Sequence, residues 1–306
     1  MNNIKVNFYS SVDDSLLKFA VIAAKYKGRW VWCKHKKRDT YEIPGGHREQ
    51  GENILDTAKR ELYEETGAVG SNIVPVCVYA VEQDGAETFG MLYYAEIAER
   101  EDELHSEIER IELFDTLPEK LTYPAIQPYL WERVNAAELW DLYTADREKT
   151  GEFHIRGNEM PDGKYHIVVS VWIKNREGKY IISQRSADRP MFPLMWECTG
   201  GSALRGETSL EAAVREVREE IGAELAPENG RLVFSQVRDI VLGQRSNSIH
   251  DVWLFDYDGD IDIKKASTKE VERAEWLSAD EIMAMFDSGK MVETLRLSFE
   301  KVLGEK

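Results

Sequence analysis

Three glutamates follow an arginine in a segment whose apolar residues recur at helical spacing. On a helix, Glu61, Glu64 and Glu65 are three and four residues apart and therefore share one neighbourhood. Clustered carboxylates repel one another, and a divalent cation removes that repulsion. All-oxygen ligation suits Mg²⁺ or Mn²⁺ rather than zinc. The segment therefore indicates a site for one of these cations.

The helix that would carry these acids is expected over residues 53–66. Its apolar stripe consists of Ile54, Leu55, Ala58 and Leu62. Glu61 and Glu65 project close to the edge of this stripe, where carboxylates lose hydration. We therefore expect a helix packed on a core, with its acids at the border of the buried face.

The same pattern occurs twice, starting at Gly46 and again at Gly201. The first copy reads GHREQGENILDTAKRELYEETGA and the second reads GSALRGETSLEAAVREVREEIGA. In the second copy the three acids are Glu216, Glu219 and Glu220. Each copy is also preceded by a glutamate three residues before a further glycine (Glu42 and Glu197). A long pattern found twice is better explained by duplication than by chance.

The repeat extends to the flanking segments. Each copy begins with two β-rich runs separated by a turn, at Gly28 and at Gly178. Downstream, residues 107–114 match residues 270–277. The resulting order of strands, loop, helix, strands and helix predicts an α+β fold in which helices cover a mixed sheet.

The length of 306 residues fits two domains, which we place at residues 1–136 and 137–306. From Trp140 the second copy has an N-terminal extension rich in Gly, Pro and Asp. We expect this extension to form turns and short strands rather than a flexible linker.

The amino-acid composition limits the classes of ligand that the protein could bind and the cellular compartment that it could occupy. The formal net charge of −17 disfavours long nucleic acids, and a small anionic substrate would need metal ions to offset the repulsion. The three cysteines are scattered, so neither a zinc ribbon nor a disulfide framework is indicated. The first residues, MNNIKVNFYSS, lack the apolar core of a signal peptide, and no run of ~18 apolar residues occurs. We expect a cytoplasmic protein without a membrane segment.

Both repeated segments match the Nudix box at every fixed position, and the chain as a whole resembles a tandem Nudix hydrolase. This resemblance implies two α/β/α sandwich domains and hydrolysis of a diphosphate linkage in a nucleoside diphosphate derivative. It also implies a role for each residue of the box. The implied metal ligands are Glu61, Glu64, Glu65 and the Gly46 carbonyl in the first domain, and Glu216, Glu219, Glu220 and the Gly201 carbonyl in the second. Arg60 and Arg215 would orient the acids, and Glu52 and Glu207 would hold these arginines.

The general base varies among Nudix enzymes, and it is either a glutamate of the box, such as Glu61 or Glu216, or one from a later loop. Glu107 and Glu270 occupy matching positions ahead of the last helix and are candidates. The alternative is that each is an ordinary loop or helix-cap acid.

The first copy resembles the MutT-like group that hydrolyses nucleoside triphosphates, including oxidised purine nucleotides. The segments YEIPGGH and SEIERIELFDTLPEKLTYP carry this similarity. ADP-ribose and dinucleoside polyphosphates remain alternative substrates. Reading a base would need a stacking aromatic residue. The candidates are Phe19, Trp30, Trp32, Tyr41 and Phe89, each of which could equally be a core residue.

The second copy resembles the branch of the family related to isopentenyl-diphosphate isomerase, through WDLY, HIVVSVWIKN and MWECTGG. Isomerisation is therefore the rival function for this domain. His154 and His166 match metal-binding histidines of the isomerase, but Gly200 and Ser202 stand where its Cys and third His would be, and Cys198 lies two residues early. The intact box favours hydrolysis.

A third alternative is that one domain is a non-catalytic binding or dimerisation module. The resemblance also implies that Nudix domains pair, either as a homodimer or within one chain.

Overall fold

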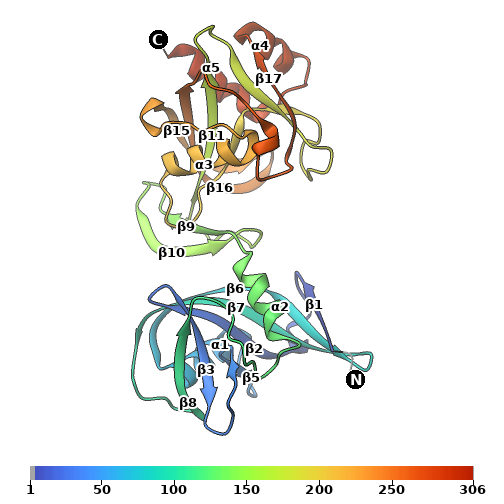
Figure 1. Cartoon of the computed structure of the whole chain (residues 1–306), viewed down its shortest axis with the longest axis vertical. Helices are drawn as coiled ribbons and strands as arrows, with labels where there is room; N and C mark the ends of the chain where they lie inside the picture. The colour runs from blue at the N-terminus through green and yellow to red at the C-terminus, as the bar shows by residue number, and fades with distance from the viewer. Residues whose placement is uncertain (1–3, 306) are drawn as a thin grey trace. The chain divides into compact units, whose positions relative to one another are not determined.

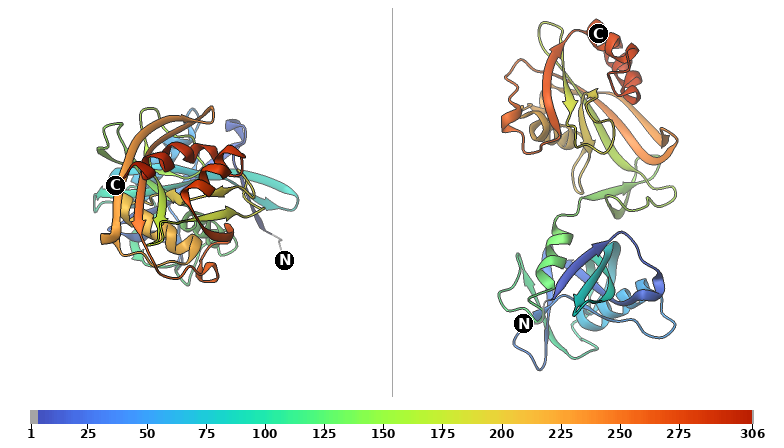
Figure 2. Two further views of the ribbon diagram at one scale, coloured as in Figure 1. Left: turned by 90° about the horizontal axis from the view of Figure 1, so that it is seen from above. Right: turned by 90° about the vertical axis from the view of Figure 1, so that its right-hand side faces the viewer.

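The computed structural model describes residues 4–305, which divide into two compact units (Figures 1 and 2). The first unit runs to Glu138 and includes Ile155–Asn158; the second comprises Leu139–His154 and continues from Glu159. The predicted boundary between residues 136 and 137 falls at the C-terminal end of helix α2. Each unit is described separately below. No helix among residues 4–305 is both long enough and apolar enough to cross a bilayer.

The first domain is built on a mixed sheet. Its strands are β1 (Lys5–Tyr9), β2 (Leu17–Tyr26), β3 (Arg29–His35), β4 (Tyr41–Glu42), β5 (Gly45–His47), β6 (Ala68–Gln83), β7 (Ala86–Arg100) and β8 (Ile108–Phe114). Within the described part of the chain, the main path of the sheet is β1-β6-β7-β2-β3-β4, with β5 paired to β2 and β8 to β3. The β2–β7 pair is parallel and its neighbours are antiparallel.

The described part of this domain also contains the short 3₁₀ turn η1 (Asp14–Leu16) and the helices α1 (Ile54–Thr66) and α2 (Gln127–Asn135). Helix α1 begins at Asn53, whose side chain accepts the Asp56 N–H, and ends at Gly67 in the left-handed conformation (φ 72°). Ala58 and Leu62 of the expected stripe are buried, as is Glu65, whereas Leu55 is exposed. Placing Leu55 on the buried face was therefore wrong, because α1 buries Thr57 there instead.

The second domain repeats this plan. Its elements are β9 (Leu139–Tyr143), β10 (Lys149–Ile155), β11 (His166–Lys174), β12 (Tyr180–Arg185), β13 (Trp196–Glu197), β14 (Thr199–Ser202), α3 (Ser209–Ile221), η2 (Pro227–Asn229), β15 (Gly230–Val241), β16 (Gln244–Asp256), η3 (Ile263–Lys265), β17 (Val271–Leu277), α4 (Ala279–Asp287), η4 (Glu293–Leu295) and α5 (Arg296–Gly304). Among the described residues, the path of the sheet is β13-β12-β11-β16-β15, with β14 paired to β11 and β17 to β12. The extension predicted to form turns and short strands forms the two-stranded sheet β9–β10.

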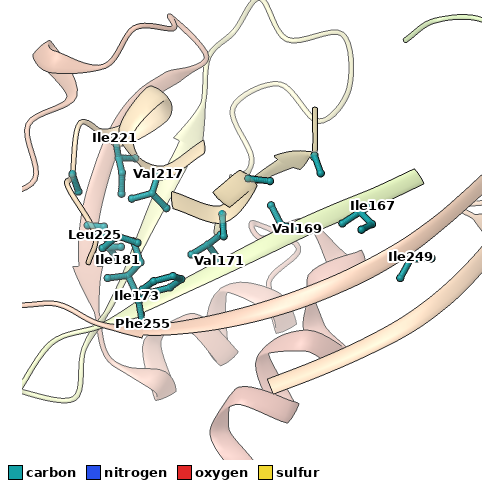
Figure 3. Packing of buried hydrophobic residues seen from close by; sticks show 14 of the residues in the cluster. Ile167, Val169, Val171, Ile173, Ile181, Val217, Ile221, Leu225, Ile249 and Phe255 are labelled. Carbon is teal, nitrogen blue, oxygen red and sulfur yellow. The ribbon is translucent and has the colours of Figure 1, made fainter. Parts of the chain in front are cut away.

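Two apolar clusters, one on each face of the second sheet, hold the helices in place. Figure 3 shows Val217 and Ile221 of α3 on the same side of the sheet as Val171 of β11. On the other face, Phe286 of α4 and Phe299 of α5 pack with Trp172 of β11. Helix α3 therefore lies opposite α4 and α5, which follow one another on one side of the sheet (Figure 2).

The strand register makes the two domains superimposable residue by residue at the site. In the first, Ala20 of β2 is opposite Gly46 of β5; in the second, Val169 of β11 is opposite Gly201 of β14. The two glycines that open the repeated motif therefore occupy the same place on the sheet. The predicted α+β fold of two domains, each a mixed sheet flanked by helices, is confirmed.

Candidate active site

The Arg60 guanidinium gathers the acids of the first domain. Its Nε donates to Glu52 Oε1 at 2.7 Å, and Nη2 donates to Glu52 Oε2 at 3.1 Å and to the His47 carbonyl at 3.0 Å. Nη1 donates to Glu61 Oε1 at 2.7 Å and to Glu64 Oε2 at 3.2 Å. One side chain thus ties the loop before α1 to two acids of the helix.

Arg215 makes the same set of contacts in the second domain. Its Nε and Nη2 donate to Glu207 at 2.7 and 3.0 Å, and Nη2 also donates to the Ser202 carbonyl at 3.0 Å. Its Nη1 lies 3.0 Å from both Glu216 and Glu219. Five hydrogen bonds to four partner residues, reproduced atom by atom in two domains, indicate a built site rather than a chance cluster on a solvated helix.

Gly46 and Gly201 let one carboxylate of each helix approach the sheet backbone. A Cβ at Gly46 would collide with the Glu61 carboxylate, and one at Gly201 would collide with that of Glu216. Because glycine has no Cβ, the backbone of β5 and of β14 lies directly against an acid side chain.

Glu65 and Glu220 are the buried acids of the two sets. Glu65 is 9% exposed and accepts the Gly45 N–H at 2.9 Å, and Glu220 accepts the Gly200 N–H at 3.4 Å. Burial, opposed by the Gly45 N–H and assisted by the nearby charges of Glu61, Glu42 and Glu107, raises the pKa of Glu65 to about 8. Burial likewise raises the pKa of Glu220 well above its usual range.

This burial predicts how the stability of the metal-free protein depends on pH. The pKa of Glu65 is about 8 in the folded chain, whereas an unperturbed Glu titrates near ~4.3. Between these values the folded state binds more protons than the unfolded state, so the stability contribution of Glu65 declines as the pH rises. We expect Glu65→Gln, which cannot ionise, to match the wild type near pH 4 and to exceed its free energy of unfolding near pH 9 by a few kcal/mol. Urea unfolding in EDTA at both pH values measures this. A stability difference that does not change with pH would contradict the assignment.

The loops that carry Glu107 and Glu270 are anchored in the same way. The His105 N–H donates to the Glu64 carbonyl and the Lys36 N–H to the Glu107 carbonyl, both at 3.0 Å. In the second domain, the Ser267 N–H donates to the Glu219 carbonyl at 3.0 Å, and the Ser186 N–H donates to the Glu270 carbonyl at 2.8 Å. The matching sequence positions are therefore matching positions in space, although Glu270, unlike its counterpart, forms an ion pair with Arg189.

A cavity of about 530 Å³ opens beside the acids of the first domain. Its polar side is lined by Gly46, Glu61, Glu64, Glu65 and Glu107. Its apolar side is lined by Phe19, Tyr79, Val81, Tyr123 and Leu130, among others. Of the aromatic residues considered for base stacking, only Phe19 lines this cavity. Trp30 and Trp32 are buried in the core, Tyr41 packs on Phe114, and Phe89 packs on Tyr9.

Two further acids belong to the sites and were treated in the sequence only as markers of the repeat. Glu42 lines the cavity of the first domain and accepts a hydrogen bond from Arg38 at 2.9 Å. Glu197 accepts two bonds from Arg185, at 2.6 and 2.7 Å, and burial raises its pKa. Their recurrence at a fixed distance before each glycine pair was a signal that could have identified them.

The chemistry of this donor set fits a hard divalent cation. Carboxylate oxygens and an exposed backbone carbonyl converge where burial and mutual repulsion disfavour free carboxylates. Within residues 4–305, no group of three or more His, Cys, Asp or Glu side chains is placed so that it could already hold a metal ion. In both domains the arginine holds two of the acids, so these carboxylates would turn from the guanidinium to accept a cation.

The histidines and the cysteine that suggested an isomerase are buried side chains. His166 stacks on Trp140 with ring centroids 4.0 Å apart, and His154 is buried against the same ring. Cys198 is buried in the cluster around Trp172, and this burial raises the pKa of its thiol. These side chains pack in the interior of the second domain.

Comparison with known proteins agrees with this geometry. The NUDIX domain model matches residues 16–116 and 164–295, well over half of the chain. An uncharacterized Nudix hydrolase of Listeria monocytogenes is 34% identical over 156 residues, which cover 51% of this chain and 88% of that protein. A Bacillus subtilis protein named "Putative 8-oxo-dGTP diphosphatase YtkD" is 29% identical over 122 residues, covering 40% and 77%. An isopentenyl-diphosphate Delta-isomerase of Escherichia coli is 28% identical over 87 residues, covering 28% and 48%.

Among solved structures, the MutT protein of Methanosarcina mazei is similar, with a TM-score of 0.39 and 23% identity over 49% of this chain and all of that one. The two matched ranges each contain one complete arginine-centred acid cluster. The chain belongs to the Nudix family and is a Nudix hydrolase with two such domains.

Proposed function

We propose that each domain hydrolyses a diphosphate linkage with Mg²⁺ or Mn²⁺ as cofactor. The observation that carries this proposal is the arginine-centred acid cluster, built twice with the same partners against a glycine backbone. The first-domain cation ligands would be Glu61, Glu64, Glu65 and the Gly46 carbonyl, and the second-domain ligands Glu216, Glu219, Glu220 and the Gly201 carbonyl. Nudix hydrolases generally use divalent cations, and the surplus of buried carboxylates here agrees with that requirement.

When bound, the cations neutralise charge on the diphosphate oxygens and lower the pKa of the attacking water. The protein itself positions the acids that would hold the cations. Arg60 and Arg215, each fixed by a bidentate bond from Glu52 or Glu207, hold the acids at a set distance from the backbone. Because the acids are already gathered beside the glycine backbone, only their carboxylate ends have to turn when a cation binds, which limits the reorganisation.

We assign proton abstraction in the first domain to Glu107. This side chain lines the same cavity as Glu61, Glu64 and Glu65, and its loop is hydrogen-bonded to both α1 and β3. In the second domain Glu270 forms an ion pair with Arg189. Glu270 would need to leave Arg189 before it could accept a proton.

The first domain is suited to a nucleotide. A cavity of about 530 Å³ is of the size that holds small ligands, and its wall combines acids with Phe19, Tyr79 and Tyr123. An aromatic wall beside a cation site fits a base next to a diphosphate. We propose a plain or oxidised nucleoside triphosphate as its substrate, with ADP-ribose and dinucleoside polyphosphates as alternatives.

For the second domain we propose hydrolysis rather than isomerisation. Isomerisation needs a group that exchanges protons with carbon, and the nearby thiol, Cys198, is buried in the core with a raised pKa. The hydrolytic acids are complete.

A substrate panel tests the proposal. The purified full-length chain would be incubated with Mg²⁺ or Mn²⁺ and 8-oxo-dGTP, plain nucleoside triphosphates, ADP-ribose, dinucleoside polyphosphates or isopentenyl diphosphate. We expect cation-dependent release of a nucleoside monophosphate, read by chromatography. Formation of dimethylallyl diphosphate would instead support an isomerase, and no turnover with either cation would overturn the proposal.

A further inference from the structure

The two sites differ in the strand residues that lie beyond the acids. In the first domain Phe19 of β2 is opposite Gly90 of β7, which is opposite Tyr79 of β6. A Cβ at Gly90 would collide with the Phe19 ring and would lie 2.8 Å from the Tyr79 ring, so the glycine makes room for two aromatic side chains. These two rings form the apolar wall of the cavity.

In the second domain, two of the same three register positions are polar. Val168 of β11 is opposite His250 of β16, which is opposite Gln236 of β15. His250 is 1% exposed and its Nε2 lies 2.8 Å from Ser170 Oγ, while its Nδ1 has no hydrogen-bond partner among the described residues. The imidazole occupies the place where aromatic rings cover a glycine in the first domain.

Two residues farther along β6 and β15, Val81 of the first domain corresponds to Arg238 of the second. Arg238 is half-buried, and its Nε makes a 3.4 Å hydrogen bond to Ser248 Oγ. Within residues 4–305, no carboxylate lies within salt-bridge distance of Arg238. The pKa of Arg238 is lowered to about 10, and the cause is burial alone. The adjacent His250 is a neutral imidazole, because burial and then the Arg238 charge lower its pKa to about 3. It therefore does not serve as a counter-ion for Arg238.

A partly buried cation without a counter-ion is costly unless a ligand supplies the charge. The matching position of the first domain, Val81, lines the cavity that holds the acids of that domain. By this correspondence Arg238 belongs to the wall of the second site. Arg238 on β15 is three strands across from the glycines of β14 and three residues offset along the strands, which at ~4.8 Å per strand and ~3.3 Å per residue is about 17 Å. That separation suits the far end of a substrate whose diphosphate lies at the acids.

We propose that Arg238 is a specificity-determining residue of the second site, where it binds a phosphate group of the substrate remote from the diphosphate that is cleaved. The inference rests on the proposed hydrolytic function of that site. It makes the second domain selective for a diphosphate substrate with an additional phosphate, whereas the first domain, with Val81 and its aromatic wall, would not distinguish such a substrate.

A matched pair of probes tests this in the full chain carrying Glu64→Gln, which inactivates the first site. Adenosine 3′,5′-bisphosphate and AMP differ by one phosphate and contain no diphosphate linkage, so calorimetry measures binding without turnover. We expect the bisphosphate to bind at least tenfold more tightly. Arg238→Met should abolish this preference, while Arg231→Met, an exposed arginine of the same strand paired with Asp256, should retain it. Because Arg238 has no counter-ion, Arg238→Met should not lower the melting temperature.

Equal binding of the two probes, or a preference that survives Arg238→Met, would overturn the inference. So would an equal loss of AMP binding, because the guanidinium would then contact another part of the nucleotide. A second arm compares hydrolysis of coenzyme A and dephospho-coenzyme A, which also differ by one phosphate. We expect Arg238→Met to raise KM for coenzyme A with little change in kcat. Hydrolysis of both compounds at rates insensitive to Arg238 would refute the inference alone, whereas the absence of hydrolysis of any substrate by the wild type would refute the proposed function.

Discussion

Replacing Glu64 with Gln should reduce hydrolysis by the first domain about 10²- to 10³-fold, and Glu219→Gln should do the same in the second. The amide keeps the size of the side chain and can still accept a bond from Arg60 or Arg215, so the fold is retained. The change removes one negative charge from the cation site, a loss comparable to that of one preorganised electrostatic group, about 3–4 kcal/mol in the transition state. Steady-state rates on each substrate of the panel measure the effect.

The two single variants also separate the two sites. If the domains act on different substrates, each variant loses a different one, and the double variant loses both. Glu132→Gln on α2 and Glu300→Gln on α5 are matched controls, because both are exposed helical glutamates outside the clusters. A double variant that keeps wild-type rates on every substrate would show that neither acid takes part.

The repeat made the acid clusters predictable from the sequence. Spacing of three and four residues placed Glu61, Glu64 and Glu65 together, and the same spacing at Gly201 excluded coincidence. The fold class followed from the order of β-rich runs and one amphipathic helix per copy. Local patterns of this kind are visible because the residues concerned are neighbours on one helix or one turn.

Contacts between distant segments were harder to foresee. Glu42 lines the first cavity, and Arg238 corresponds to Val81 of that cavity, only through the pairing of strands, which one sequence does not specify. Phe19 and Trp30 look alike as candidates for base stacking, yet one lines a cavity and the other is buried. Which face of a strand each residue takes depends on register, and register depends on partners that are far away in the chain.

The adjacent glycines Gly45 and Gly46 should respond differently to substitution by alanine. The first variant should lose stability, and the second should lose activity. A Cβ at Gly45 would meet the Ala20 carbonyl and would lie 2.9 Å from Val21 Cα, both backbone atoms of the paired strand β2. Since β2 cannot move without disrupting the sheet, Gly45→Ala should destabilise the first domain by about 3 kcal/mol, a melting-temperature loss on the order of 10 °C. The three atoms nearest to a Cβ at Gly46 all belong to the Glu61 carboxylate, the end of a flexible side chain.

Gly46→Ala should therefore fold normally and yet lose activity about 10²-fold, because the displaced carboxylate no longer lies against the β5 backbone. Circular dichroism melting and turnover of the first-domain substrate, measured on both variants, separate the two effects. The second domain offers an internal repeat of the experiment: Gly200→Ala would meet the Val169 carbonyl, and Gly201→Ala would meet only the Glu216 carboxylate. Wild-type turnover by Gly46→Ala would show that the position of Glu61 against this backbone is not needed for catalysis. Loss of folding by Gly46→Ala would show instead that the helix cannot yield there, and that the close approach of α1 to β5 serves stability.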